Sequence, residues 1–370
     1  MENDINKGKR RPTAIDLFSG AGGLTVGLKK AGFRVVGAVE IESAASATYA
    51  ANHPEVHAIN EDIKKITSRQ LLDLTSDGVI DLIAGCPPCQ GFSSLTAKHM
   101  RNDPRNELIK EMVRIISEIR PLAVMMENVP GLYNRGRHLL NDCFSEMEKV
   151  GYKISFDVLQ VADFGVPQNR KRLVVLAGLG FDIPVPESTH SKNGENGLIR
   201  WKSVGDAIRG LPTPVTFDVA IKQGGPNRYN WHVVRTMSPI NKLRIKHVKP
   251  GETRAHLPEE LRPRCHKGHD HGFANFYGRL SWDQPSSTIT GGCTTLSKGR
   301  FGHPEQDRTI SVRESALLQT FPPDYFFNTM HMDKVCNMIG NALPCTFAEA
   351  LAKHVHKFMS LNNGQFPKTN

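Results

Sequence analysis

Short apolar runs alternate with helical patterns through the first half of the chain. The runs are typical of buried strands and occupy residues 14–18, 35–40, 58–63, 82–84, 122–129, 154–161 and 172–178. Between them, apolar residues recur at helical spacing, as along 43–52 and 108–119. This alternation predicts strand–helix–strand units, and hence an α/β domain with helices packed on its sheet.

The pattern changes at about residue 181. Gly, Pro, Ser, Asn and basic residues dominate from Pro184 to Phe301, which predicts a second, irregular domain. Pro285–Gly292 looks like a strand that ends at a tight turn. A last helix, opening near Pro344 and reaching about His356, has an apolar face for which the first domain's sheet is the natural partner. We therefore expect three parts: a large domain over 1–182, a small domain over 183–330, and a helical segment over 331–370 that returns to the large domain.

Composition narrows the class of protein. The 370 residues carry a formal net charge of +10, which makes a polyanionic partner plausible without proving one. Seven cysteines form no disulfide framework, and the odd number agrees with a reducing compartment. No apolar span approaches membrane length, and the N-terminus lacks the apolar core of a signal peptide. We expect a cytoplasmic protein without a membrane partner, or a nuclear one if its source is eukaryotic, since Lys7–Arg11 could be a nuclear signal as well as a solvated tail.

The most informative stretch is Cys86-Pro-Pro-Cys89. It follows the apolar run 82–84, and its two prolines stiffen the step from strand to loop. Three interpretations compete: two partly buried structural thiols, a thioredoxin-like redox pair, and a catalytic nucleophile at Cys89. A nucleophile needs partners elsewhere in the chain, and the remaining motifs supply them.

A glycine turn and two strand-end acids suggest a nucleotide-like ligand. Ser19–Gly23 links the first strand to a helix, a geometry that brings backbone close to a ligand, although such a turn can also be only a turn. Thr25 at the sixth position excludes the dinucleotide fingerprint. Glu40 ends the second strand, where an acid accepts bonds from ribose hydroxyls, or is simply exposed. Asp62 could contact an adenine amine or cap the following helix, and the spacing leaves both open.

Three further features are candidates for catalysis or for binding a substrate. Glu127 ends a buried strand and mirrors Cys89 one strand over, although it could be a strand-end acid bonded to backbone. Arg170 and Arg172 alternate at the start of a strand, so both guanidiniums face one side and suit phosphate or carbonyl oxygens. The polar loop 91–102 carries Lys98, His99 and Arg101 and suits a lid.

A histidine-rich stretch in the small domain raises the question of a metal. Cys265, His266, His269 and His271 match no usual paired-ligand spacing for zinc, so we expect no metal. A basic loop that faces nucleic acid is the better interpretation.

Taken in order, these segments resemble the C5-cytosine DNA methyltransferase family. The matching motifs span nearly the whole chain: Asp16–Gly23, Glu40, Asp62-Ile63, Gly85–Ser93, Glu127–Val129, Gln168–Arg172, Val312–Glu314 and Gly340-Asn341. The resemblance implies an S-adenosylmethionine-dependent enzyme with a mixed seven-stranded, Rossmann-like methyltransferase sheet, helices on both sides, and a smaller irregular target-recognition domain facing it across a DNA-sized cleft.

The resemblance also implies residue roles. Cys89 would be the nucleophile, Glu127 would hold the cytosine, Arg170 would bind the base oxygen, and Arg172 would position the thiol and a phosphate. The residues that would line the S-adenosylmethionine pocket are Phe18, Gly20, Gly22, Gly23, Glu40, Ile41, Asp62, Ile63, Leu108 and Asn341. Double-stranded DNA would be met by Gln90, Ser93, Arg105, Thr288 and Thr290, and the target cytosine would be flipped out of the duplex.

Two departures and two alternatives accompany the resemblance. Ile41 stands where some members carry an aromatic residue that packs on adenine, and Ala342 replaces a frequent serine. Some relatives methylate tRNA instead, but the long basic segment argues against that substrate. A non-catalytic DNA-binding relative is the other alternative, and the intact Cys89, Glu127 and Arg170 argue against it. We expect a monomer, with a cognate restriction endonuclease as a genetic partner only.

Overall fold

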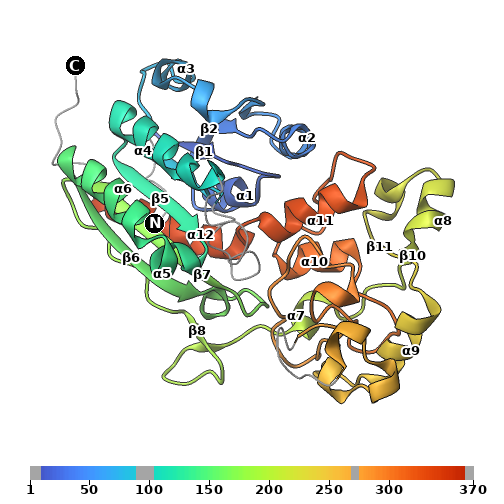
Figure 1. Ribbon diagram of the computed structural model, residues 1–370. Helices are drawn as coiled ribbons and strands as arrows, with labels where there is room; N and C mark the ends of the chain where they lie inside the picture. Colours follow the sequence, from blue (N-terminus) through green and yellow to red (C-terminus); the bar gives the residue numbers. More distant parts are fainter. Residues whose placement is uncertain (1–9, 89–103, 268–274, 363–370) are drawn as a thin grey trace, which may run out of the picture.

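A computed structural model describes residues 10–88, 104–267 and 275–362. Its centre is a seven-stranded sheet in the order β3-β2-β1-β4-β5-β7-β6 (Figure 1). The strands are β1 (Thr13–Leu17), β2 (Arg34–Val39), β3 (His57–Ile59), β4 (Leu82–Gly85), β5 (Ala123–Asn128), β6 (Tyr152–Gln160) and β7 (Lys171–Leu179). β7 runs antiparallel to both of its neighbours and all other pairs are parallel, which confirms the expected mixed sheet.

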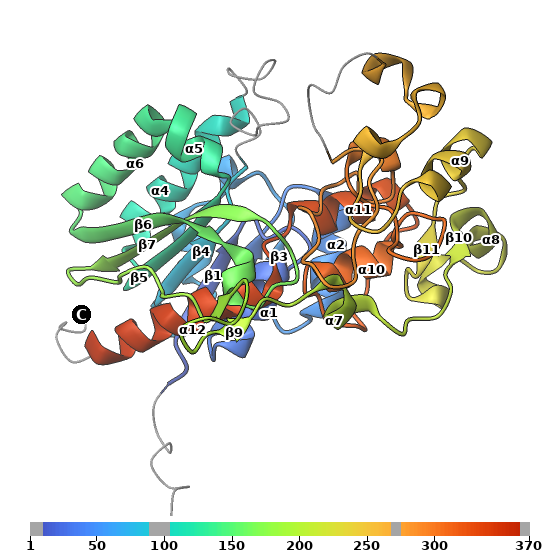
Figure 2. The ribbon, with the colours of Figure 1, turned by 90° about the horizontal axis from the view of Figure 1, so that it is seen from below.

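Helices cover both faces of this sheet (Figure 2). One face carries α4 (Leu108–Ile119), α5 (Pro130–Arg135) and α6 (Arg137–Lys149), and the other face carries α1 (Gly23–Lys30) and α12 (Cys345–Asn362). Of the two remaining helices, α3 (Ser68–Leu72) packs against α4 and α2 (Ser43–Asn52) packs against β3. Alternate strand residues explain the two faces. Ile15 and Leu17 join the core on the α4 side, whereas Ala14, one residue before Ile15, joins the core with α1 and α12.

A third apolar core surrounds the fully buried Trp231 of the small domain and also includes Ala21, Val26 and Ala45 of the large domain. The small domain contains short strands β8 (His190–Ser191), β9 (Ile199–Arg200), β10 (Val215–Thr216) and β11 (Val233–Val234), and helices α7 (Val204–Ile208), α8 (Phe217–Lys222), α9 (Pro239–His247), α10 (Val312–Leu318) and α11 (Met332–Asn341). Val335 and Ile339 of α11 join this core, so α11 packs with the small domain although its sequence follows residue 330.

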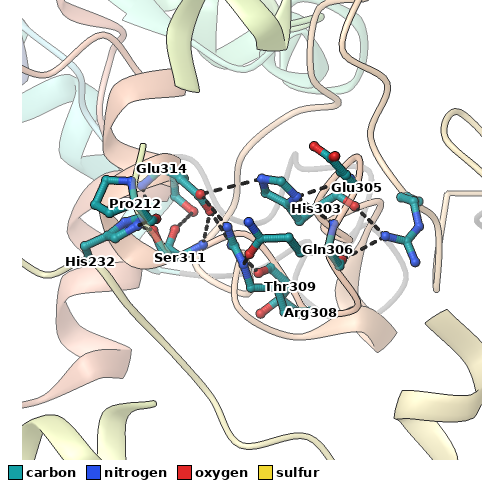
Figure 3. A network of polar contacts seen from close by, with 11 residues as sticks. Pro212, His232, His303, Glu305, Gln306, Arg308, Thr309, Ser311 and Glu314 are labelled. Carbon is teal, nitrogen blue, oxygen red and sulfur yellow. Dashed lines mark hydrogen bonds and ion pairs between the residues drawn. The ribbon is translucent and has the colours of Figure 1, made fainter. Parts of the chain in front are cut away.

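A buried polar network fixes the start of α10 (Figure 3). Ser311 caps the helix and forms a capping box with Glu314. Arg308 donates to both carboxylate oxygens of Glu314, at 2.7 and 2.8 Å, while His303 lies 3.8 Å away. Burial alone would raise the pKa of Glu314, but the Arg308 guanidinium outweighs it and holds that pKa below its usual range. The carboxylate of the Val-Arg-Glu motif is thus part of the frame of the small domain.

Three elements differ from the sequence prediction. The third strand ends at Ile59 rather than residue 63, because Asp62 caps a short 3-10 helix that takes its place. Residues 285–292 form no strand; only Ser286 makes an isolated bridge, to Gln168. The last helix begins at Cys345 and continues to Asn362, well past His356, and it packs on the sheet as expected.

Candidate active site

The carboxyl ends of β1, β2, β4 and β5 meet at one edge of the sheet because these strands are parallel. Phe18, Glu40 and Cys86 follow the ends of β1, β2 and β4, and Glu127 is the second-last residue of β5. β7 enters this edge from the opposite direction, with Leu173 opposite Asn128. The four segments singled out in the sequence therefore converge on one small region.

A buried ion pair marks the centre of this region. Arg172 Nε lies 2.5 Å from Glu127 Oε1, and the contact has the geometry of an ion pair rather than of an aligned hydrogen bond. Both side chains are nearly buried, with exposed fractions of 12% and 9%. An arrangement of this kind, a carboxylate and a guanidinium fixed at a strand edge, can present both an acceptor and donors to one planar polar group.

Cys86 lies beside this pair and is not set up to react. Burial raises the pKa of its thiol, and the Glu127 carboxylate, to which the thiol is hydrogen-bonded, raises it further. A redox pair requires a thiolate of low pKa, so this environment speaks against a thioredoxin-like role. Asn128 Nδ2 donates to Pro87 O at 3.0 Å and so fixes the proline step that leads to Cys89.

In the glycine turn, Gly20 has open space beside it and Gly22 is tightly packed. Gly20 has φ +54°, and a Cβ there would meet nothing within 4 Å. A Cβ on Gly22, at φ +96°, would lie 2.7 Å from both His53 Nε2 and Tyr325 Oη. The turn therefore leaves space on one side only, which fits a ligand lying against Gly20.

Glu40 faces the same turn. Its carboxylate accepts the Gly20 N–H at 2.9 Å and the Glu42 N–H at 2.7 Å. Burial raises the pKa of this carboxyl, and the two backbone donors oppose that shift. Next to it, Ile41 exposes 65% of its side chain, an unusual surface position for an isoleucine and one that an apolar ring could cover. Together with the open side of Gly20, these residues fit an adenosine-containing cofactor.

The other expected cofactor residues are spread around this edge. Asp62 uses Oδ1 to accept the Lys64 N–H at 3.0 Å, which is the capping role left open by the spacing. Ile63 is buried and Leu108 half-buried at the start of α4; Phe18 is half-buried at φ +60°, and Asn341 is exposed at the end of α11.

Asp16 is a titratable group that the sequence did not single out by itself. It is fully buried; its Oδ2 accepts the Thr25 hydroxyl at 2.7 Å, and Thr25 in turn contacts Tyr49 Oη at 2.8 Å. Burial raises the pKa of Asp16 to about 7, and the nearby Glu40 charge adds to the effect. Behind the glycine turn, this carboxyl therefore titrates near neutral pH.

Arg170 lies close to Arg172 but has different partners. Its Nη1 donates to Ile289 O at 2.9 Å and Gly340 O at 3.1 Å, and its Nη2 donates to Gly340 O at 3.2 Å and Ala342 O at 3.4 Å. Only its Nε has no partner among the described residues. Burial lowers the pKa of this guanidinium, and the Arg172 charge lowers it further. Most of the donors of Arg170 are therefore occupied by backbone carbonyls.

The expected DNA-binding residues divide into two groups. Gln90, Ser93 and the Arg105 side chain lie outside the described part of the chain, as does Cys89, the expected nucleophile. Thr288 and Thr290 are both half-buried. The Thr288 hydroxyl donates to Asn169 O at 2.8 Å, and the Thr290 hydroxyl accepts the Gly292 N–H at 3.3 Å. The Thr288 hydroxyl is thus held by the segment before β7, and the Thr290 hydroxyl by its own turn.

Four residues at this edge were not among the predicted site residues. Asn128 fixes Pro87, the Tyr325 hydroxyl donates to Ala21 O in the glycine turn, and Gln168 pairs with Gln319. Asn128 and Gln168 stand inside the quoted motifs, a signal that could have found them. Tyr325 and Gln319 act over more than a hundred residues, and local pattern contains no sign of such contacts.

The described ranges contain neither a membrane-spanning helix nor a cluster of metal ligands. None of their helices is long and apolar enough to cross a membrane. No group of three or more His, Cys, Asp or Glu side chains in them could hold a metal ion.

Residues 13–357 match the family model for the C-5 cytosine-specific DNA methylase. Type II methylase M.HgiDII of Herpetosiphon aurantiacus is 37% identical over 351 residues, covering 93% of this chain and 95% of the relative. Type II methyltransferase M1.HphI of Haemophilus parahaemolyticus is 35% identical, covering 93% and 87%. The crystal structure of a prophage-encoded candidate DNA modification methyltransferase from E. coli superposes with a TM-score of 0.71 at 25% identity, over 94% of this chain and 99% of that one. The chain is a member of the C-5 cytosine-specific DNA methylase family of enzymes.

Proposed function

We propose that this protein transfers a methyl group from S-adenosylmethionine to C5 of a cytosine in a specific sequence of duplex DNA. The buried Glu127–Arg172 pair carries this proposal. It stands directly beside Cys86-Pro87-Pro88, the rigid step that leads to Cys89. A flipped cytosine presents N3, an exocyclic amine and a carbonyl oxygen along one edge, and an adjacent carboxylate and guanidinium match that edge.

The chemistry requires a nucleophile at this place. Cytosine C5 reacts poorly with a methyl sulfonium, and addition of a thiolate to C6 turns the ring into an enamine that is nucleophilic at C5. Once C5 carries the methyl group and S-adenosylhomocysteine has left, loss of the C5 proton and β-elimination would break the C6–S bond and release the thiolate. We assign the thiolate to Cys89 and the hold on N3 and the amine to Glu127. Arg172, being the arginine paired with Glu127, is our choice for the base oxygen. Arg170 lies next to it with its Nη donors bound to carbonyls, so we move it from the base to a supporting role.

S-adenosylmethionine would supply the methyl group. We propose that it lies against the open side of Gly20, with Glu40 at its ribose and Ile41 at its adenine. Phe18, Gly22, Gly23, Asp62, Ile63, Leu108 and Asn341 would complete the pocket. The aliphatic Ile41 can cover one face of the adenine, although without the stacking that an aromatic ring provides.

We assign residues 1–182 and the returning α12 to catalysis and cofactor binding, and residues 183–330 with α11 to target recognition. Gln90, Ser93, Arg105, Thr288 and Thr290 would face the DNA. The curated relatives quoted above are bacterial Type II methylases. By analogy we propose a monomeric cytoplasmic enzyme that acts on the nucleoid, with a restriction endonuclease of the same specificity as genetic partner.

The test is methyl transfer and covalent trapping. Purified enzyme with labelled S-adenosylmethionine should label duplex DNA and leave tRNA unlabelled, and bisulfite sequencing should place the mark at cytosine within one short sequence. DNA that carries 5-fluorocytosine at this site should form an adduct that survives a denaturing gel.

Cys89→Ser is the decisive variant, with Cys86→Ser as its matched control. Cys86→Ser should still form the adduct, because its thiol is protonated and bonded to Glu127. Adduct formation by Cys89→Ser, or labelling of tRNA in preference to DNA, would refute the proposal.

A further inference from the structure

Two buried glutamines join four distant segments of the chain. Gln168 Nε2 donates to Gln319 Oε1 at 2.7 Å, and Gln168 Oε1 accepts the Ile289 N–H at 2.9 Å. Gln319 Nε2 donates to Ile339 O at 2.5 Å and Ala342 O at 3.1 Å. Both glutamines are fully buried. Their side-chain amides therefore connect the segment before β7, the backbone at Ile289, the end of α10 and the end of α11.

Arg170, in the same segment as Gln168, takes part in this contact. We call the three side chains of Gln168, Gln319 and Arg170 the joint. The Arg170 guanidinium holds Ile289 O, Gly340 O and Ala342 O, so it binds the same two distant segments as the glutamines. None of these acceptors is a carboxylate, and the side chain is only 3% exposed. A buried cation solvated by carbonyls alone is costly compared with an apolar side chain of similar size. Stability by itself is therefore a weak reason for an arginine here.

The residues of the joint and their partners lie within one or two residues, along the chain, of three parts of the proposed site. Arg172, two residues after Arg170, makes the ion pair with Glu127. Gly340 and Ala342, whose carbonyls Arg170 binds, flank Asn341 of the proposed cofactor pocket. Thr288 and Thr290 flank Ile289, which Gln168 and Arg170 hold by its N–H and its carbonyl.

The backbones at this point touch directly. A Cβ on Gly340 would overlap the backbone of Thr290 and Gly291, so the end of α11 lies on residues 286–291, the recognition segment, with no side chain between them. A shift of the joint would therefore move the recognition segment, Asn341 and Arg172 together.

We propose that Gln168, Gln319 and Arg170 are positioning residues, which hold the recognition segment 286–291 and the cofactor residue Asn341 in register with the Glu127–Arg172 pair. The inference rests on the proposed function, since it concerns the alignment of the same site. It predicts that weakening the joint lowers the rate of methyl transfer in molecules that remain folded. A misplacement of about 1 Å is enough to cost a large factor in rate.

The small domain offers a matched control in Arg279. It is also buried, at 4%, and it also donates to carbonyls, those of Ile245, Val248, His303 and Gln306, together with the Asp307 carboxylate. All of these partners lie within the small domain. Arg279→Lys should therefore cost stability as Arg170→Lys does, without disturbing the alignment of the two halves.

The experiment compares Arg170→Lys, Gln319→Met and Gln168→Met with Arg279→Lys in the full-length enzyme. For each, the melting temperature and circular dichroism establish the folded fraction at the assay temperature. Then kcat and KM are measured per folded molecule, and the Kd of S-adenosylhomocysteine is measured by calorimetry. The joint variants should lose at least about tenfold in kcat, and Arg170→Lys should also weaken cofactor binding, while Arg279→Lys keeps both.

A double-mutant cycle adds a readout that a structural role would not move. If the two amides act as one unit, Gln168→Met/Gln319→Met should lose no more kcat than the more severe single variant. Unchanged kcat in the folded joint variants, or an equal loss in Arg279→Lys, would overturn the inference. If Arg170→Lys does not fold, the glutamine variants decide.

Failure of the proposed function is visible separately. A wild-type enzyme that leaves cytosine unmethylated refutes that function. The role of the joint can then still be tested by comparing the S-adenosylhomocysteine affinity of Arg170→Lys with that of Arg279→Lys. Equal affinities in those two variants and wild type would then refute the joint as well.

Discussion

Glu127 and Arg172 form a nearly buried ion pair at the sheet edge. Glu127→Gln keeps the shape of the side chain but removes the negative charge, so Arg172 loses its ion pair. We expect methyl transfer to fall by roughly 10²–10⁴-fold, the range for a lost acid–base group, with DNA binding largely retained. Single-turnover kinetics and a gel-shift titration would measure the two effects. A variant with more than a tenth of the wild-type rate would contradict the role given to Glu127.

Asp16 should make the stability of the protein fall as the pH rises. Because burial raises the pKa of this carboxyl to about 7, the folded chain keeps a proton that the unfolded chain loses near pH 4. The stability contributed by that proton is present in acid and disappears as the pH climbs from about 4 to about 7. Asp16→Asn should remove this dependence, which is at most about 1.4 kcal/mol per pH unit for one proton.

Urea unfolding of wild type and Asp16→Asn at several pH values between about 5 and 8 would test this prediction. The two stabilities should differ by more at pH 8 than at pH 5. Parallel curves would show that Asp16 is ionised throughout in the folded protein.

The sequence placed single residues well where their position depends on a strand end. Glu40 and Glu127 were expected at the ends of buried runs, and both lie there because parallel strands finish at one edge. Arg170 shows where such inference stops. Alternation predicted that it shares a face with Arg172, but its carbonyl partners are more than a hundred residues away in the chain, so spacing could not distinguish a base ligand from a joint.

The glycine turn between β1 and α1 separates two effects that one substitution usually mixes. Gly20 and Gly22 both have positive φ, so alanine costs each of them roughly 1–2 kcal/mol of backbone energy. Only at Gly22 would the new methyl group also collide, with His53 and Tyr325. Gly22→Ala should therefore lower the melting temperature more than Gly20→Ala does.

Gly20→Ala, in contrast, should weaken cofactor binding, because its methyl group enters the open space that we assign to the cofactor. Calorimetry with S-adenosylhomocysteine and thermal melts of both variants would separate the effects. Equal cofactor affinity in Gly20→Ala and wild type would place the ligand elsewhere.

Whole elements followed the apolar pattern closely in the large domain, because a buried strand or an amphipathic helix needs few partners to be recognised. The segment 43–52 was expected to be helical, and α2 has the same bounds. The small domain was less predictable. Residues 285–292 look like a strand in the sequence, but their backbone pairs with the segment 167–169 and lies against the end of α11 instead of joining a sheet.

Our proposed division into a catalytic part and a recognition part predicts that sequence specificity can be transferred between relatives. Under this proposal, phosphate contacts from the large domain would position the DNA without reading its sequence directly. Replacing residues 184–307 with the segment of a relative of different specificity should transfer methylation to that relative's sequence, since each base contact is worth roughly 1–3 kcal/mol of discrimination. Methylome sequencing of cells expressing the chimera would show the site. An active chimera that still marks the original sequence would place recognition in the large domain.

The close contact between α1 and α12 has a consequence for protein synthesis. A Cβ on Gly27 would lie 2.5 Å from Ala348, so the first helix and the last touch almost backbone to backbone, and α12 fills the core beneath β1 and β4. The ribosome makes β1 and its glycine turn early, yet their core stays open until the final helix leaves the exit tunnel. A chain terminated before α12 is expected to bind no cofactor, which equilibrium dialysis of a chain ending at residue 341 would check. An incomplete chain could then bind DNA but would not methylate it.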